Sequence, residues 1–188
     1  MYVYLRPGPV RAAVAALCLA VLLAGAGPMY ADSPTHSASY GTFYSPVTAG
    51  ISFTGKVEHK GFHSLQAALQ LTDILDGKTS SPGYCLSYHR NFVIGASELR
   101  TGYPLRLYCG PGVKAGYVRE KGGRRGTMLG VSAAFGGRVY MLDGFCLTLE
   151  WQLSPAFLIH RDSGSEMSSY KYPWTSFWIP RLMISKCL

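Results

Sequence analysis

Residues 127–153, TMLGVSAAFGGRVYMLDGFCLTLEWQL, contain two segments in which apolar side chains alternate with small or polar ones. In 127–141 the apolar positions are Leu129, Val131, Ala133, Phe135, Val139 and Met141. In 145–153 they are Phe145, Leu147, Leu149, Trp151 and Leu153. An alternation of period 2 predicts a β-strand with two different faces. Asp143-Gly144, which separates the segments, is a type I′ hairpin signal, so we expect the two strands to be antiparallel neighbours.

The same alternation recurs along the chain on both sides of this hairpin. The expected strands are 47–60, 63–73, 84–94, 104–118, 127–141, 145–153 and 174–188. Segment 63–73 is also compatible with a helix that is capped by Ser64 and stopped by Gly77. Pro180 interrupts the last segment, where we expect a bulge or an unpaired amide.

The apolar faces of the four clearest strands (47–60, 104–118, 127–141 and 145–153) carry no charge. A soluble barrel would show a wet and charged outer face. A lipid-facing charge costs roughly 2–4 kcal/mol at the bilayer midplane, and these segments reach the about 9–11 residues that a spanning strand needs. We therefore expect the apolar faces to contact lipid, with small and charged residues inside. The alternative is an exported soluble barrel that binds a small ligand.

The strand count predicts one further strand. Bacterial membrane barrels have an even number of strands, and the turn at 143–144 together with a periplasmic C-terminus would make strand 47–60 start outside the cell. An earlier strand must bring the chain there, and 36–44 (HSASYGTFY) is the candidate. The predicted fold is all-β: an eight-stranded antiparallel up-and-down transmembrane β-barrel over residues 32–188.

The N-terminal segment 1–31 is predicted to be a cleaved signal peptide. Arg6 and Arg11 form a positive n-region, and 12–26 is an uninterrupted run of apolar and small residues, short for a membrane-spanning helix. Loss of these two arginines lowers the formal net charge from +8 to +6. A moderately basic exported protein is expected to meet an anionic lipid surface rather than nucleic acid.

Four cysteines remain after the predicted cleavage: Cys85, Cys109, Cys146 and Cys187. An even number in an oxidising compartment permits disulfides, in three possible connectivities. Free thiols that behave as small hydrophobes are the alternative, and the sequence leaves both open. The spacing is not of the zinc-binding type, so we expect neither a metal nor another cofactor.

Three segments resemble the small outer-membrane β-barrel proteins of Gram-negative bacteria, porin-like proteins of the OmpX and OmpW size class. They are LRLYCGPGVKAGYVRE (105–120), LGVSAAFGGRVYML (129–142) and LTLEWQLSPAFLI (147–159). The resemblance implies a protein that is located in the outer membrane, is inserted by the barrel insertion machinery and contacts outer-membrane lipids and lipopolysaccharide. The sequence leaves the oligomeric state open, and a monomer is favoured. Such barrels usually finish on an aromatic residue, whereas this chain finishes Lys186-Cys187-Leu188.

Charged residues on the small-and-polar faces are expected in the barrel interior. They are Lys56, Glu58, Arg106, Lys114, Arg138, Glu150 and Arg181. Eight strands enclose an interior just wide enough for side chains to fill. Unpaired buried charge is costly, so we expect an ion pair between Glu150 and Arg138 on adjacent strands. The interior is therefore predicted to be structural, or to pass small anions weakly, with specific contacts left to the surface loops.

Two further sets of residues are predicted to lie at the membrane boundary. Aromatic residues near strand ends suit interfacial girdles: Tyr117, Tyr140, Trp151, Trp174 and Trp178. A basic loop patch is placed outside, where it would meet lipopolysaccharide phosphates or remain solvated: Arg119, Lys121, Arg124 and Arg125.

Catalysis is a minor alternative. Some small outer-membrane barrels that resemble this chain modify lipid A with a serine, a histidine and an acid. Ser87 and His89 share one strand face, and Ser154 and His160 are close in sequence. No complete set of nucleophile, base and orienting group can be assembled from them, so we expect no enzyme.

Overall fold

The protein is described by a computed structural model over residues 38–58, 60–71, 83–119, 125–141, 144–160, 167–169 and 180–188. The strands are β1 (Ser39–Tyr44), β2 (Thr48–Thr54), β3 (Gly61–Gln70), β4 (Tyr84–Glu98), β5 (Pro104–Arg119), β6 (Arg125–Tyr140), β7 (Phe145–Leu153), β8 (Ala156–Ile159), β9 (Met167–Ser169) and β10 (Arg181–Cys187). The predicted signal peptide, residues 1–31, lies outside these ranges. Within them, no helix has the length and apolar character needed to cross a membrane.

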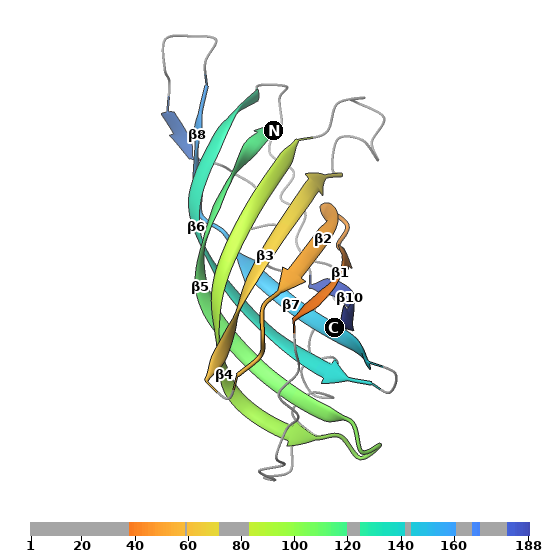
Figure 1. Cartoon of the computed structure of the whole chain (residues 1–188). Coiled ribbons are helices and arrows are strands. Elements are labelled where there is room, and N and C mark those ends of the chain that lie inside the picture. The colour runs from red at the N-terminus through yellow and green to blue at the C-terminus, as the bar shows by residue number, and fades with distance from the viewer. Residues whose placement is uncertain are drawn as a thin grey trace, which may run out of the picture.

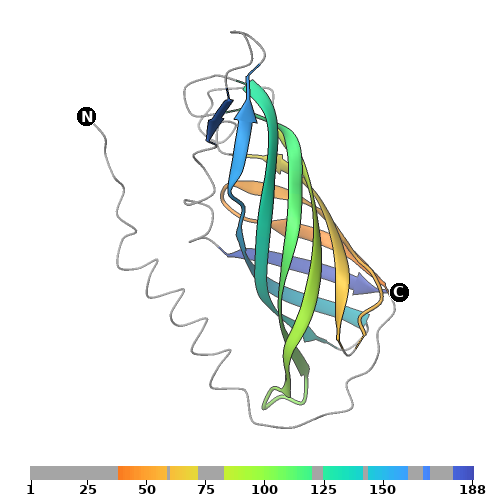
Figure 2. The ribbon, with the colours of Figure 1, turned by 90° about the vertical axis from the view of Figure 1, so that its left-hand side faces the viewer.

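The strands form one antiparallel sheet that closes into a barrel (Figures 1 and 2). Each strand from β1 to β6 pairs with the next, β7 pairs with β6 and β10, and β10 pairs with β1. β8 continues β7 along β6 without a change of register across Ser154 and Pro155. β9 lies beside β8 as β10 lies beside β7. The ten named strands thus occupy eight positions in the wall, which confirms the predicted eight-stranded antiparallel barrel.

The strands are tilted in the barrel. A path through directly paired residues starts at Tyr117 on β5 and returns to β5 at Leu107, ten residues earlier. It passes through Tyr84, Leu69, Ala49, Tyr44, Leu182, Leu149 and Gly137. Such a stagger is what closing a tilted sheet requires. Side chains from all eight wall positions point into the interior.

The alternation seen in the sequence decides which side chains enter this core. Along β6, Met128, Ser132 and Ala134 are buried, whereas Val131 and Phe135 are exposed. Gly136 leaves space inside: a Cβ at that position would lie 2.7 Å from the Tyr108 hydroxyl. The small residues on the inner face are therefore required for the interior to close around its larger side chains.

Two segments differ in extent from the sequence-based expectation. Segment 63–73, for which strand and helix were both open, forms strand β3, whose bounds are Gly61–Gln70. β4 extends to Glu98 into the expected loop 95–103, and its pairing with β5 shifts register between Val93 and Gly95. The hairpin then turns at Gly102, whose φ of 80° suits glycine.

The two ends of the barrel domain agree with the expected strands where the structure describes them. β1 lies within the expected strand 36–44, and Thr42 pairs with Ile51 on one side and Ile184 on the other. The expected strand 174–188 is described from 180 onward, and β10 begins directly after Pro180. β1 is therefore the strand that closes the sheet against the C-terminal strand.

Candidate functional site: the interior and outer face of the barrel

A hydrogen-bonded network crosses the interior around Glu150. The Gln66 Nε2 group donates to Glu150 Oε1 at 3.0 Å, and the Tyr108 hydroxyl donates to Glu150 Oε2 at 2.8 Å. Arg181 donates to Gln66 Oε1 at 3.0 Å. Gln66 is on β3 and Glu150 on β7, which stand on opposite sides of the barrel. One glutamine amide thus links a cation and a carboxylate across the interior.

Arg138 forms a second crossing. Its Nε donates to Thr148 Oγ1 at 3.1 Å, and its terminal nitrogen donates to Thr54 Oγ1 on the opposite wall at 3.0 Å. The guanidinium also lies over the Phe62 ring, 5.0 Å from its centroid. Buried guanidinium groups are stabilised by such donor pairing and by aromatic faces.

The expected ion pair between Arg138 and Glu150 is wrong. Arg138 stands directly opposite Thr148 on β7, whereas Glu150 stands opposite Gly136. The absent side chain at Gly136 leaves room for the Tyr108 hydroxyl, which bonds to the carboxylate instead. Neighbouring strands alone do not pair two charges, because the register decides which side chains face each other.

Five of the seven expected interior charges lie where they were predicted. Arg106 and Arg181 are buried, as are Arg138 and Glu150. Lys114 is half-buried on the inner face of β5. The described inward-facing charges thus comprise one carboxylate, that of Glu150, and four cations.

The predicted placement of Lys56 and Glu58 in the interior is wrong. Both are exposed, because β2 ends at Thr54 and the alternation of buried and exposed side chains shifts by one residue after it. Glu58 forms an isolated bridge with Gly61, and the side chain that turns inward here is Val57, which is 1% exposed. The end of the strand interrupts the period of 2 on which their placement depended.

Apolar clusters pack above and below the polar network. One comprises Phe43, Ala68, Cys85, Val118, Met128, Ala156, Leu158 and Met183. The other comprises Val57, Phe62 and Tyr108, with Val93 against it. Phe62 and Tyr108 meet edge to face with centroids 5.0 Å apart. Tyr108 thus belongs both to this apolar cluster and to the polar network around Glu150.

His89 is at the centre of a buried contact that the sequence did not indicate. Ser87 and His89 both face inward, but the histidine Nε2 lies 2.8 Å from Ser132 Oγ and 2.7 Å from Gln152 Nε2. Ser132 is on β6, two wall positions from β4, and both it and His89 stand opposite Gly112 on β5, where the missing side chain leaves them room to meet. The histidine is 0% exposed, and its Nδ1 has no hydrogen-bond partner among the described residues. A catalytic triad needs an acid bonded to the second ring nitrogen of the histidine and a serine that a substrate can reach. Neither is found at His89 among the described residues.

Ser154 and His160 are the other pair considered for catalysis. Both side chains are buried, and His160 Nδ1 lies 3.3 Å from the backbone oxygen of Arg125. No set of three or more His, Cys, Asp and Glu side chains among the described residues is arranged to hold a metal ion.

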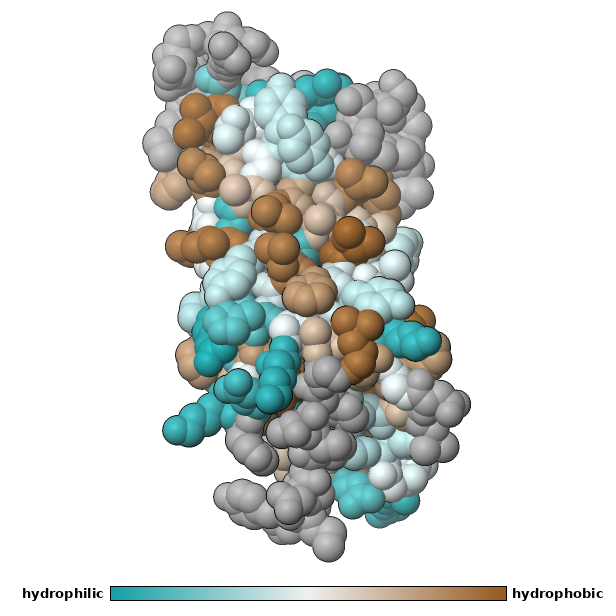
Figure 3. Space-filling view, in the orientation of Figure 1, coloured by the Kyte–Doolittle hydropathy of each residue, from teal (hydrophilic) through white to brown (hydrophobic). Residues whose placement is uncertain are grey.

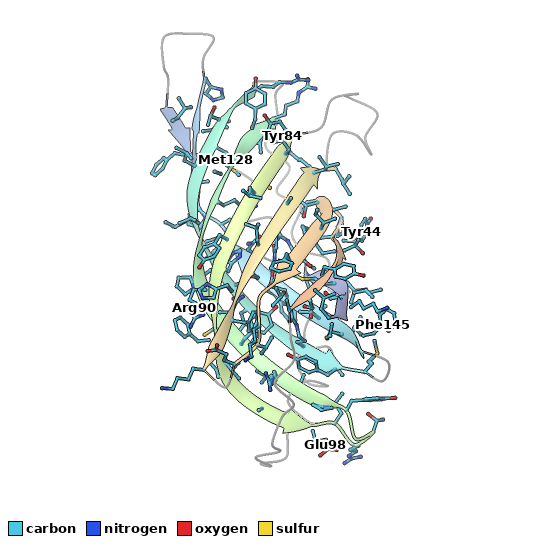
Figure 4. The ribbon with its side chains drawn as sticks, in the orientation of Figure 1. Tyr44, Tyr84, Arg90, Glu98, Met128 and Phe145 are labelled. Atoms are coloured by element: carbon cyan, nitrogen blue, oxygen red, sulfur yellow. The ribbon has the colours of Figure 1, made fainter. Side chains whose placement is uncertain are left out.

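The outer face of the wall is apolar. Figure 3 shows hydrophobic side chains over the middle and upper part of the visible face, with hydrophilic ones toward its lower left. Exposed fractions reach 62% for Val131 and 64% for Ile51. Arg90, which points away from the wall in Figure 4, lies over the Phe92 ring, and Lys186 lies over the Phe145 ring. These two outward cations thus rest against aromatic rings.

The predicted boundary aromatics divide between the two faces. Tyr117 faces outward, and its ring centroid lies 6.2 Å from that of Tyr84. The ring centroids of Trp151 and Phe135 are 6.3 Å apart. Tyr140 is a correction: it is 5% exposed and faces inward, under the Arg106 guanidinium. Its even position in β6 places it on the same face as Ser132 and Arg138. Trp174 and Trp178 lie outside the described residues.

The predicted basic loop patch is described in part. Arg119 and Arg125 are paired across the end of the β5–β6 hairpin, and Arg125 is exposed. Lys121 and Arg124 lie outside the described residues.

In comparisons with known proteins, no protein-family model matches the chain. No curated protein matches it either. Among solved structures, it is similar to the crystal structure of the N-terminal β-barrel domain of Pseudomonas aeruginosa OprF, with a TM-score of 0.53 and 13% sequence identity. The match covers 83% of this chain and 100% of that one. The chain therefore shares its fold, a closed eight-stranded antiparallel β-barrel, with the N-terminal domain of OprF.

Proposed function

We propose that this protein is an integral outer-membrane β-barrel whose packed polar interior is structural and whose surface loops make any specific contact. The observation that carries the proposal is the inverted distribution of polarity. Glu150 and Arg138 are hydrogen-bonded inside, while large apolar side chains such as Ile51 and Val131 cover the outside. In water, contiguous apolar patches beyond a few hundred Å² are rare on monomers, whereas in lipid this is the stable arrangement.

The partners that follow are outer-membrane lipids and the machinery that inserts barrels. The Arg119–Arg125 end of the β5–β6 hairpin supplies positive charge for lipopolysaccharide phosphates. We propose that the protein is a monomer, because closure of the wall leaves no unpaired sheet edge between β1 and β10 to recruit a second copy. We also propose that it is not an enzyme, since the serine and histidine pairs are enclosed in the interior.

The full chain, expressed in a Gram-negative host, is expected to fractionate with the outer membrane and to show heat-modifiable migration. Detergent extracts are run unheated and boiled on the same gel, with reductant in every lane. A closed barrel resists the detergent until it is heated, because all its backbone groups are paired around the wall. A soluble protein without a migration shift contradicts the proposal and favours the ligand-binding alternative.

The interior is expected to conduct ions far less than an open porin does. Side chains fill the interior of an eight-stranded barrel, whereas 16–18 strands leave an aqueous channel, and here Arg138 reaches from β6 to Thr54 on β2. The test is single-channel recording of purified protein in a planar bilayer, with a sixteen-stranded porin as the reference. Sustained steps of porin size would show that the interior is a channel.

A further inference from the structure

Two of the cysteines meet at one end of the barrel. The Sγ atoms of Cys146 and Cys187 are 2.7 Å apart, little more than the about 2 Å of a disulfide bond. Cys146 is the second residue of β7, and Cys187 is the last residue of β10. Cys146 stands opposite Ser185, so Cys187 is its diagonal neighbour on the inner face. The pairing register itself therefore brings the two sulfur atoms together.

The other two cysteines are placed where they cannot form a bridge. Cys85 faces inward from β4 within the apolar cluster that contains Met128, whereas Cys109 occupies an outward-facing position of β5. Cys85 pairs with Gly116, seven residues along β5 from Cys109. Disulfide formation requires Cα atoms less than about 7 Å apart and Cβ atoms that point toward each other. Of the connectivities that the sequence leaves open, the structure thus supports one bridge and two free thiols.

The cysteine pair lies at the end of the barrel where the residue before β1, the C-terminus and a short turn meet. The Leu188 amide donates to the Ala38 carbonyl at 2.8 Å, and the Met141 amide donates to the Phe145 carbonyl at 2.8 Å. The compartment that the cysteine pair faces follows from the outer-membrane topology proposed above, in which short turns and the C-terminus face the periplasm. That compartment oxidises thiols, and Cys187 is partly exposed to it.

We propose that Cys146 and Cys187 form a disulfide bond that links strand β7 covalently to the C-terminal strand β10. The Cys187 thiolate attacks the disulfide of a periplasmic thiol oxidoreductase and forms a mixed disulfide. The Cys146 thiolate then attacks the Cys187 sulfur and displaces the oxidoreductase thiolate. The first attack breaks the oxidoreductase S–S bond and frees one of its thiolates, and the second attack frees the other. These two thiolates take up the protons lost by Cys146 and Cys187, so the oxidoreductase leaves as a dithiol, reduced by two electrons. Cys146 is 0% exposed in the closed barrel, so exchange takes place before the barrel is complete.

The bridge would secure a short strand. β10 is held by six residue pairs on each side, against β1 and β7, and the residues it connects are 41 positions apart. A cross-link over a long loop removes conformations from the unfolded chain. It would hold β10 in register against β7.

The test counts thiols in the full chain. Cells expressing the wild type, Cys146→Ser, Cys187→Ser, Cys85→Ser or Cys109→Ser are harvested into excess N-ethylmaleimide under denaturing conditions. Mass spectrometry then identifies alkylated and linked peptides. The wild type is expected to show alkylation at Cys85 and Cys109 and a linked peptide pair containing Cys146 and Cys187. Cys187→Ser is expected to free the Cys146 thiol, whereas Cys85→Ser and Cys109→Ser should retain the bridge.

A second measurement reports the consequence for stability. Reductant is expected to shift the heat-modification midpoint to lower temperature in the wild type and Cys85→Ser, and to leave Cys146→Ser unchanged. Alkylation of all four wild-type thiols, or a linked pair containing Cys85 or Cys109, would overturn the bridge. Four free thiols in a heat-modifiable membrane protein would contradict the disulfide and leave the membrane assignment standing. A soluble protein with the linked pair would retain the bridge and remove the membrane assignment.

Discussion

Replacing Glu150 with leucine is expected to destabilise the folded barrel by roughly 2–6 kcal/mol. The carboxylate accepts hydrogen bonds from Gln66 and Tyr108, both of them buried. Each buried donor left without a partner costs about 1–3 kcal/mol. The change also removes the one inward-facing carboxylate described among four cations. Unfolding by urea in detergent micelles, followed by tryptophan fluorescence, measures the effect.

Glu58→Leu is the matched control for this change. Glu58 is exposed at the turn between β2 and β3 and was predicted to share the interior with Glu150. We expect the urea midpoint of Glu58→Leu to stay at the wild-type value. Equal midpoints for wild type and Glu150→Leu would mean that the network around Glu150 does not hold the interior together.

Replacing Val131 with arginine is expected to destabilise the barrel in a lipid bilayer by about 2–4 kcal/mol. Val131 is 62% exposed on the outer face, near the middle of β6. In a membrane this position is in hydrocarbon, where a guanidinium loses its hydration. In water an exposed substitution of this kind is nearly neutral. Equilibrium unfolding from liposomes distinguishes the two environments.

Thr127→Arg provides the depth control, because Thr127 is on the same face of β6 near the end of the strand. A charge near the interface costs about 0–1 kcal/mol, so Thr127→Arg should remain close to the wild type. If Val131→Arg and Thr127→Arg unfold alike, the outer face of β6 is not embedded in lipid.

The period-2 alternation accounts for the parts of the fold that were predicted from the sequence. Apolar and polar positions in 127–141 and 145–153 correspond to the exposed and buried faces of β6 and β7. The alternation holds there because extended backbone directs successive side chains to opposite faces. It fails at Lys56 and Glu58, where β2 has ended and the alternation shifts by one residue.

The contacts inside the barrel depend on information that single strands do not carry. Tyr140 follows the alternation and faces inward, although a tyrosine near a strand end also suits a membrane interface. Glu150 is bound by Gln66 from the opposite wall, and His89 meets Ser132 from β6. These partners are set by the stagger of the whole sheet and by the space left at Gly136 and similar positions.

The sequence by itself determined the strands other than 63–73 and their two faces, because these follow from local alternation. The eighth strand followed from the rule that bacterial membrane barrels have an even number of strands. The tertiary structure alone decided which interior residues bind one another and which cysteines meet. Arg138 bonds to Thr54, and Cys146 approaches Cys187, across 84 and 41 positions of the chain respectively. Arg138 reaches Thr54 only when the tilted sheet closes, whereas Cys146 and Cys187 meet through the pairing register of the neighbouring strands β7 and β10.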